Sequence, residues 1–203
     1  MKLFLTSQAS KVLDKIAGSL DNPPVAYSLL FIPTAGDPYG DNKPWLEEDR
    51  QKLYELGFKI EDYDLKGKKK NEVKKAVEKS DIIFVAGGNT FYLLDKMRAS
   101  GFDQIIRELQ GSDRVYIGSS AGSCIAGPNI EPIAAFDDPS RAQLESSKAL
   151  ELVDFVVLPH SGKEKYADIQ AKVISEYGNK YKIIQITDEQ MIVVENGNYE
   201  ITK

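Results

Sequence analysis

The sequence predicts an α/β fold, with a mostly parallel, doubly wound sheet and flanking helices. Short apolar runs alternate along the chain with segments whose apolar residues recur at helical spacing, which is the βαβ pattern. Residues 29–32 form an uninterrupted apolar run, typical of a strand buried on both faces of a parallel sheet. Crossovers between such strands are right-handed, and ligands bind beyond the carboxyl ends of the strands.

The first half of the chain alternates strand and helix. Two prolines at positions 23 and 24 end a helix expected over 11–20. Residues 33–44 are rich in Gly, Pro, Asp and Asn and are expected to form a loop at the carboxyl end of a strand. The expected elements are strand 2–6, helix 11–20, strand 29–32, helix 45–56, strand 58–61, helix 71–79 and strand 81–86.

The second half continues this alternation and ends in a β-hairpin. An irregular acidic stretch over 131–147 interrupts it. The last two strands are joined through Asn196-Gly197, the dipeptide that favours a tight hairpin turn. The expected elements are a helix beginning near 91, strand 114–117, a small-residue helix after it, strand 155–158, helix 163–177, and strands 183–186, 191–194 and 199–201.

Length and composition indicate an ordinary globular protein with a single α/β domain over residues 1–203. Hydrophobic residues make up 42% and charged residues 28% of the chain. The net charge of -5 argues against nucleic acid as a partner, because phosphate binding needs a basic surface. The lysine-rich residues 66–70 are expected to be a solvated turn, since no aromatic residues interleave with them.

A reducing, cytoplasmic location and the absence of a cofactor are further expectations. Cys124 is the only cysteine, so no intramolecular disulfide can form, and one histidine with one cysteine leaves too few ligands for zinc. The apolar run near the N-terminus, residues 3–5, is too short for a signal peptide, and no stretch predicts a membrane partner. The exposed edge strands of the sheet could be covered by a second copy of the chain, so a homodimer is among the expected assemblies.

The pentapeptide Gly118-Ser119-Ser120-Ala121-Gly122 is the motif around which the chemistry is predicted. A G-x-S-x-G sequence between a strand and a helix is typical of a nucleophile elbow, which lifts one serine hydroxyl clear of the sheet. Gly118 and Gly122 are expected where a Cβ would crowd the facing strand or helix. Ser120 is therefore the candidate nucleophile. The alternative interpretation of the pentapeptide is an ordinary tight turn of small residues without a catalytic role.

A serine nucleophile needs a base, and the chain has a single imidazole, His160. His160 lies two residues after the strand 155–158, and we expect it at the sheet edge where Ser120 emerges. A carboxylate should fix the imidazole tautomer, and Asp137 is the first candidate, with Asp138 next. Glu131 and Asp154 are further candidates for this carboxylate. The alternative interpretation is that all four are solvent-exposed acidic residues without a catalytic role.

The oxyanion hole is predicted to use two backbone N–H groups, those of Gly88 and Ala121. The alternative interpretation of residues 87–88 is an ordinary turn between a strand and a helix. A phosphate-binding loop is weaker still, because no phosphate-binding motif is present. Two rival nucleophiles are weaker. Ser119 should point back into the fold, and Cys124, one helical turn from Ser120, should pack under the elbow.

The segments 84–94 (FVAGGNTFYLL), 118–130 (GSSAGSCIAGPNI) and 158–162 (LPHSG) resemble the dipeptidase E or aspartyl dipeptidase group of serine peptidases, peptidase family S51. The resemblance covers most of the chain. It implies a fold similar to class I glutamine amidotransferases, with Ser120 in place of their cysteine. It also implies cleavage of peptides after an N-terminal acidic residue, or of isopeptide bonds in the cyanophycinase branch, without a metal.

The resemblance implies that Ser120 is the nucleophile and His160 the base. The expected activity is a serine-type dipeptidase or exopeptidase acting on small peptides with an acidic first residue. The arginine that aspartyl-specific members use has no clear match, so the substrate-binding candidates are Asn89, Lys163 and Lys165, with Arg141 as another nearby cation. The alternatives are a hydrolase of another amide or isopeptide and a non-catalytic binding module.

Overall fold

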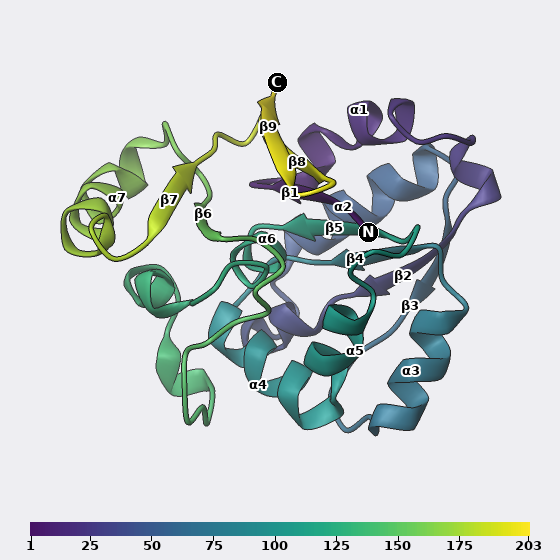
Figure 1. Ribbon diagram of the computed structural model, residues 1–203, viewed down its shortest axis with the longest axis horizontal. Coiled ribbons are helices and arrows are strands. Elements are labelled where there is room, and N and C mark those ends of the chain that lie inside the picture. The colour runs from purple at the N-terminus through teal and green to yellow at the C-terminus, as the bar shows by residue number, and fades with distance from the viewer.

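The structure, a computed structural model, describes residues 1–203. It contains a seven-stranded sheet in the order β3-β2-β4-β5-β1-β8-β9 and a separate two-stranded sheet of β6 and β7 (Figure 1). The strands are β1 (Lys2–Thr6), β2 (Ser28–Ile32), β3 (Lys59–Asp62), β4 (Ile82–Val85), β5 (Val115–Ser119), β6 (Phe155–Leu158), β7 (Lys182–Gln185), β8 (Met191–Glu195) and β9 (Asn198–Thr202).

Seven α-helices and five short 3-10 segments connect these strands. The helices are α1 (Leu13–Gly18), α2 (Pro44–Glu55), α3 (Lys70–Glu78), α4 (Thr90–Ser100), α5 (Phe102–Glu108), α6 (Ala121–Cys124) and α7 (Glu164–Tyr177). The 3-10 segments are η1 (Ala9–Lys11), η2 (Pro24–Ala26), η3 (Thr34–Tyr39), η4 (Glu131–Ala135) and η5 (Pro139–Arg141). No helix has both the length and the apolar character that crossing a bilayer requires.

The predicted α/β fold is confirmed. The first five strands of the chain are parallel to one another in the large sheet, and β8 and β9 add an antiparallel edge beside β1. The predicted hairpin is present, with Asn196 at φ 50° and Gly197 at φ 76°. Both turn residues therefore adopt the positive φ that a tight two-residue hairpin requires.

Alternate residues of each central strand enter separate cores on the two faces of the sheet. In β1, Leu3 and Leu5 join a core of 36 buried residues, whereas Phe4 joins a core of 16. Figure 1 shows α1 and α2 covering one face, with α3, α4 and α5 on the other. The strands are thus buried on both sides, which explains their continuous apolar sequence.

The small sheet corrects one expectation about His160. Strand β6 pairs in parallel with β7 and not with any strand of the large sheet, so His160 does not arise from the sheet that carries Ser120. Positions beside β5 are already filled by β4 and β1. Strand β6 packs against α6 instead, and its four residues join the larger core. The end of β6 therefore lies beside the elbow because β6 packs against α6, and not because it pairs with a strand of the large sheet.

Helix boundaries differ from the prediction where glycine or small residues intervene. The helix expected to begin near 91 is two helices, α4 and α5, because Gly101 takes a left-handed conformation at φ 74°. The helix after the elbow has only four residues, and β5 extends through Gly118 and Ser119. Ser120 consequently stands between the last residue of β5 and the first of α6.

Candidate active site

Ser120 forms a strained turn at the carboxyl end of β5. Its backbone has φ 48° and ψ -104°, a conformation that non-glycine residues rarely adopt. A Cβ added at Gly122 would lie 2.0 Å from the carbonyl oxygen of Val85, and one added at Gly118 would lie 2.5 Å from the carbonyl oxygen of Gly122. Only glycine fits at these two positions, and the tight packing holds the serine at the bend.

The structure brings His160 to this bend. Its Nε2 lies 3.2 Å from Ser120 Oγ, within hydrogen-bond reach. His160 itself has φ 63°, and its backbone N–H donates to the Ser7 hydroxyl at 2.7 Å. Its ring stacks on Tyr166, with centroids 5.4 Å apart. Backbone and ring contacts together orient the imidazole toward Ser120.

Asp188 is the carboxylate that contacts the other ring nitrogen. Its Oδ1 lies 2.8 Å from His160 Nδ1. Asp188 comes three residues after β7, and β7 lies parallel to β6, so the segments that follow these strands meet at one edge of the small sheet. Ser120, His160 and Asp188 therefore form a continuous chain of contacts in the order of a Ser-His-Asp triad.

The prediction that Asp137 contacts His160 is wrong in this geometry. Asp137 Oδ2 accepts the backbone N–H of Thr90 at 2.8 Å, at the start of α4. Unpaired N–H groups and the positive end of the helix dipole attract a carboxylate to this position. The other carboxylates considered pair elsewhere: Asp138 with Arg141, Glu131 with Lys180, and Asp154 with Lys182.

The Asp188 carboxylate is held in its ionised form. Burial opposes the charge, but hydrogen bonds from Lys163, Ser7 and His160 outweigh it and lower the pKa of Asp188 to about 2. An ionised acceptor at Nδ1 favours the tautomer with a proton on Nδ1. In that tautomer, Nε2 carries the free lone pair that faces Ser120.

The backbone N–H groups of Gly88 and Ala121, the two predicted for the oxyanion hole, donate to no acceptor in the protein. Gly88 has φ 149°, and a Cβ there would lie 2.1 Å from the carbonyl oxygen of Ala35. The neighbouring Gly87 approaches the elbow so closely that a Cβ would lie 3.3 Å from the Cβ of Ser120. The glycine turn after β4 thus packs directly against the serine, as an oxyanion site requires.

Ser120, His160 and the glycine turn at 87–88 line a cleft of about 610 Å³. One part of its wall is Tyr39 packed edge-on against Trp45, with centroids 5.2 Å apart. Another part is Phe136 beside Tyr166, at 5.8 Å. The cleft has the dimensions and the apolar walls of a site for a small molecule or a short peptide.

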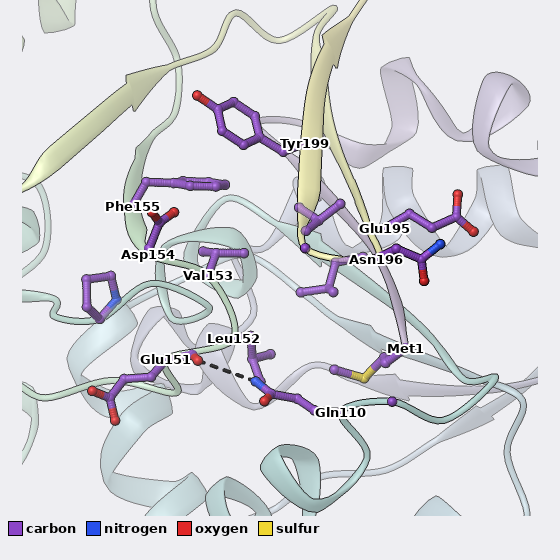
Figure 2. Close-up of a pocket in the computed structure, with 15 residues that line it drawn as sticks. Met1, Gln110, Glu151, Leu152, Val153, Asp154, Phe155, Glu195, Asn196 and Tyr199 are labelled. Carbon is purple, nitrogen blue, oxygen red and sulfur yellow. Dashed lines mark hydrogen bonds between the residues drawn. The ribbon is translucent and has the colours of Figure 1, made fainter.

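A second cavity of equal volume, about 610 Å³, contains none of this chemistry. It lies between the β8–β9 hairpin and the segment that leads into β6 (Figure 2). Figure 2 shows Gln110 reaching across to the backbone of Glu151, with Tyr199 on the hairpin side. Its lining holds neither serine nor histidine.

Comparison with known sequences matches the model of Peptidase family S51 to residues 3–202. The chain belongs to this family. Proteins of similar sequence include ones named "Peptidase E" and "Probable alpha-aspartyl dipeptidase", and the chain is a serine peptidase.

Relatives of this S51 peptidase agree in sequence and in structure. An uncharacterised peptidase of Listeria monocytogenes is 34% identical over 99% of this chain and 97% of its own. Peptidase E of Shewanella amazonensis is 34% identical over 72% of this chain and 57% of its own. A crystal structure from Listeria monocytogenes, assigned provisionally to peptidase E, superposes with a TM-score of 0.91 at 32% identity, covering 100% and 98% of the two chains.

Three residues predicted to bind substrate in the S51 peptidase have different surroundings. Asn89 caps α4, accepting the N–H of Tyr92 at 2.8 Å, and is buried. Lys163 pairs with Asp188. Lys165 is exposed at the cleft, with its ammonium 4.6 Å from the ring of Tyr166. Lys165 alone of the three has a charge directed to the cleft and uncommitted to an ion pair.

The two rival nucleophiles are turned away from catalysis. Ser119 is buried and accepts the backbone N–H of Ala9 at 3.2 Å. Cys124 is buried, its thiol donates to the carbonyl of Val157, and burial raises the pKa of this thiol well above its usual range. Both side chains pack beneath the elbow as expected.

Sequence reasoning missed Asp188 and Ser7. Each follows a strand of the S51 peptidase by one to three residues, Ser7 after β1 and Asp188 after β7. A polar residue directly beyond an apolar strand was the available signal, since such residues gather at the carboxyl edge. For Asp188 the signal depends on knowing that β7 pairs with β6.

Proposed function

We propose that this S51 peptidase hydrolyses small peptides from their N-terminus through an acyl-enzyme on Ser120. His160 is the general base and Asp188 the carboxylate that orients it. The observation that carries the proposal is the unbroken contact chain from Ser120 Oγ through both ring nitrogens to Asp188 Oδ1. A lone serine at an elbow would be unreactive near neutral pH without this chain.

In the first half-reaction, Ser120 Oγ bonds to the peptide carbonyl carbon while its proton passes to His160 Nε2. The negative charge that develops on the carbonyl oxygen is stabilised by the N–H groups of Gly88 and Ala121. The C–N bond then breaks, and Nε2 returns the proton to the leaving amine. In the second half-reaction, Nε2 takes a proton from water, the hydroxide attacks the ester, and Ser120 is released with its proton.

Asp137 supports recognition of a free N-terminus. Its carboxylate lines the same cleft, and one oxygen accepts the N–H of Thr90. Asp137 forms no ion pair, whereas its neighbour Asp138 pairs with Arg141. Burial raises the pKa of Asp137 despite its hydrogen bonds, so the charge is incompletely compensated. The α-ammonium group of a bound peptide would supply the missing positive charge. We therefore propose that the protein is an exopeptidase or dipeptidase rather than an endopeptidase.

A preference for an acidic first residue rests on Lys165. Its ammonium is the cation at the cleft that remains available once Lys163 is paired with Asp188. Lysine presents a point charge rather than the two-pronged fork of arginine, so we expect the preference to be modest.

The test is hydrolysis of dipeptides that differ only in the first residue, Asp, Glu, Asn or Ala, together with their N-acetylated forms. We expect turnover of the free dipeptides, slower or no turnover of the acetylated ones, and a loss of about 10³-fold or more in Ser120→Ala. Lys165→Gln should reduce kcat/KM for Asp and Glu substrates and leave that for Ala unchanged.

Three results would overturn the proposal. Hydrolysis in Ser120→Ala within about tenfold of wild type would remove the acyl-enzyme. Turnover restricted to isopeptides or to non-peptide amides would point to another hydrolase on this scaffold, and no turnover of any amide by a folded protein would point to a binding module.

A further inference from the structure

Ser7 lies at the centre of the contacts around Asp188. Its side chain is 1% exposed and stands directly after β1 in the large sheet. The hydroxyl accepts the backbone N–H of His160 at 2.7 Å and donates to Asp188 Oδ1 at 2.6 Å. It also lies 3.0 Å from His160 Nδ1. One hydroxyl therefore ties the histidine backbone, the imidazole and the carboxylate to the large sheet.

Lys163 contacts the opposite side of the same carboxylate. Its ammonium pairs with Asp188 Oδ2, while Oδ1 is taken by Ser7 and His160. Lys163 is the residue before α7, three positions after His160. The hydrogen bonds and ion pair of Ser7 and Lys163 go to His160 and Asp188 and not to Ser120, and neither residue has a place in the Ser-His-Asp chain itself.

We propose that Ser7 and Lys163 are positioning residues that act on His160 through Asp188, Ser7 setting the orientation of the imidazole and Lys163 its basicity. The inference rests on the proposed function for its kinetic consequence, but its structural content concerns the histidine alone.

The orientation effect follows from backbone strain. His160 has φ 63°, a region that a non-glycine residue occupies only where its surroundings hold it. The Ser7 hydroxyl is the group that binds the N–H of this residue. Without it, both the strained backbone and Asp188 Oδ1 lose a partner, and the imidazole is free to leave the line between Ser120 and Asp188.

The basicity effect follows from the charges that face the imidazole. Asp188 contacts Nδ1, Asp137 lies within electrostatic range, Lys163 stands behind Asp188, and the uncharged ring of Tyr166 covers one face. The two carboxylates stabilise the imidazolium, and the Lys163 ammonium opposes it. Removing that ammonium should let the imidazole hold its proton to higher pH.

The test uses NMR of the imidazole, because His160 is the only histidine and its ring signals need no assignment. In Lys163→Met, we expect the titration midpoint of His160 to rise by about half a pH unit or more, and Lys163→Arg should restore it. Lys172→Met, which removes an exposed lysine of the same helix, is the matched control. In kinetics, the acid limb of kcat/KM should move in the same direction.

For Ser7→Ala, we expect ring nitrogen shifts that report a mixture of tautomers and a fall in kcat of at least about tenfold with little change in KM. Ser100→Ala, which removes another buried hydroxyl at the far end of α4, controls for general loss of packing. Circular dichroism establishes that each variant is folded.

An unchanged His160 midpoint in folded Lys163→Met overturns the proposal, whatever happens to Ser7→Ala. A wild-type tautomer in folded Ser7→Ala overturns the orientation effect. These NMR results do not depend on turnover, so failure of this inference is distinguishable from failure of the proposed function, which Ser120→Ala kinetics decide.

Discussion

Asp188 Oδ1 lies 2.8 Å from His160 Nδ1, although the two residues are 28 positions apart and neither belongs to the large sheet. On this contact we propose Asp188, rather than Asp137, as the acid of the triad. Asp188→Asn should lower kcat by about 10³- to 10⁴-fold, because an amide does not hold the tautomer that leaves Nε2 free. Steady-state kinetics on the preferred dipeptide measure the loss.

Asp138→Asn is the control for this change. Asp138 is exposed, pairs with Arg141 and has no contact with His160, so near wild-type turnover is expected. Equal losses in the two variants would contradict the role of Asp188.

Asp137→Asn should separate binding from chemistry. The amide oxygen can still accept the N–H of Thr90, so α4 keeps its N-terminal partner while the cleft loses a charge. A charged hydrogen bond is worth about 1.5–3 kcal/mol, so KM for free dipeptides should rise about 10- to 100-fold with kcat nearly unchanged. A fall in kcat as large as that of Asp188→Asn would place Asp137 in the triad after all.

Gly88→Ala should damage both stability and activity. The added Cβ would lie 2.1 Å from the carbonyl oxygen of Ala35, at a φ of 149°. We expect a loss of stability of at least about 2 kcal/mol by thermal or denaturant unfolding. Displacement of the Gly88 N–H should further lower kcat by about 10²-fold or more in the fraction that remains folded.

The matched control for this glycine is Gly18→Ala. Gly18 ends α1, and a Cβ there meets nothing within 4 Å. Stability should be unchanged or rise by up to about 1 kcal/mol, since alanine is the better helix former. A Gly88→Ala variant as stable and active as Gly18→Ala would refute the close approach.

Asp49→Asn should change the pH dependence of stability. Asp49 is 1% exposed and accepts the N–H of Ser10 at 2.8 Å, and burial raises its pKa to about 7. The folded protein therefore holds this proton up to about pH 7, whereas the unfolded chain releases it near pH 4, so stability falls between these values as pH rises.

An asparagine removes this fall. The difference in unfolding free energy between Asp49→Asn and wild type should grow in favour of the variant from pH 4 to pH 8, by up to roughly 4 kcal/mol. Chemical denaturation at the two pH values measures it. A difference that stays constant would mean that Asp49 ionises normally in the folded protein.

Much of the fold and part of the site can be predicted from sequence because their signals are local. Uninterrupted apolar runs identify strands such as β2, and the spacing of Gly118 and Gly122 around Ser120 identifies the elbow. His160 can be singled out because the chain has no other imidazole.

The acid could not be predicted, because it depends on a pairing between distant strands. In sequence, Asp137 and Asp188 are both acidic residues in polar segments. Only the parallel pairing of β6 with β7 carries Asp188 to Nδ1, and only the position of α4 directs Asp137 to Thr90. Nor does any local pattern show that Lys163 would pair with Asp188 rather than with substrate.

The most direct test of the central claim is the labelling of Ser120 by a fluorophosphonate, followed by peptide mapping in a mass spectrometer. The account predicts one adduct, on Ser120, with labelling about 10²-fold or more slower in Asp188→Asn and in His160→Gln, and at the wild-type rate in Asp138→Asn. A folded protein that forms no adduct at Ser120, or that labels equally fast without His160, would contradict it.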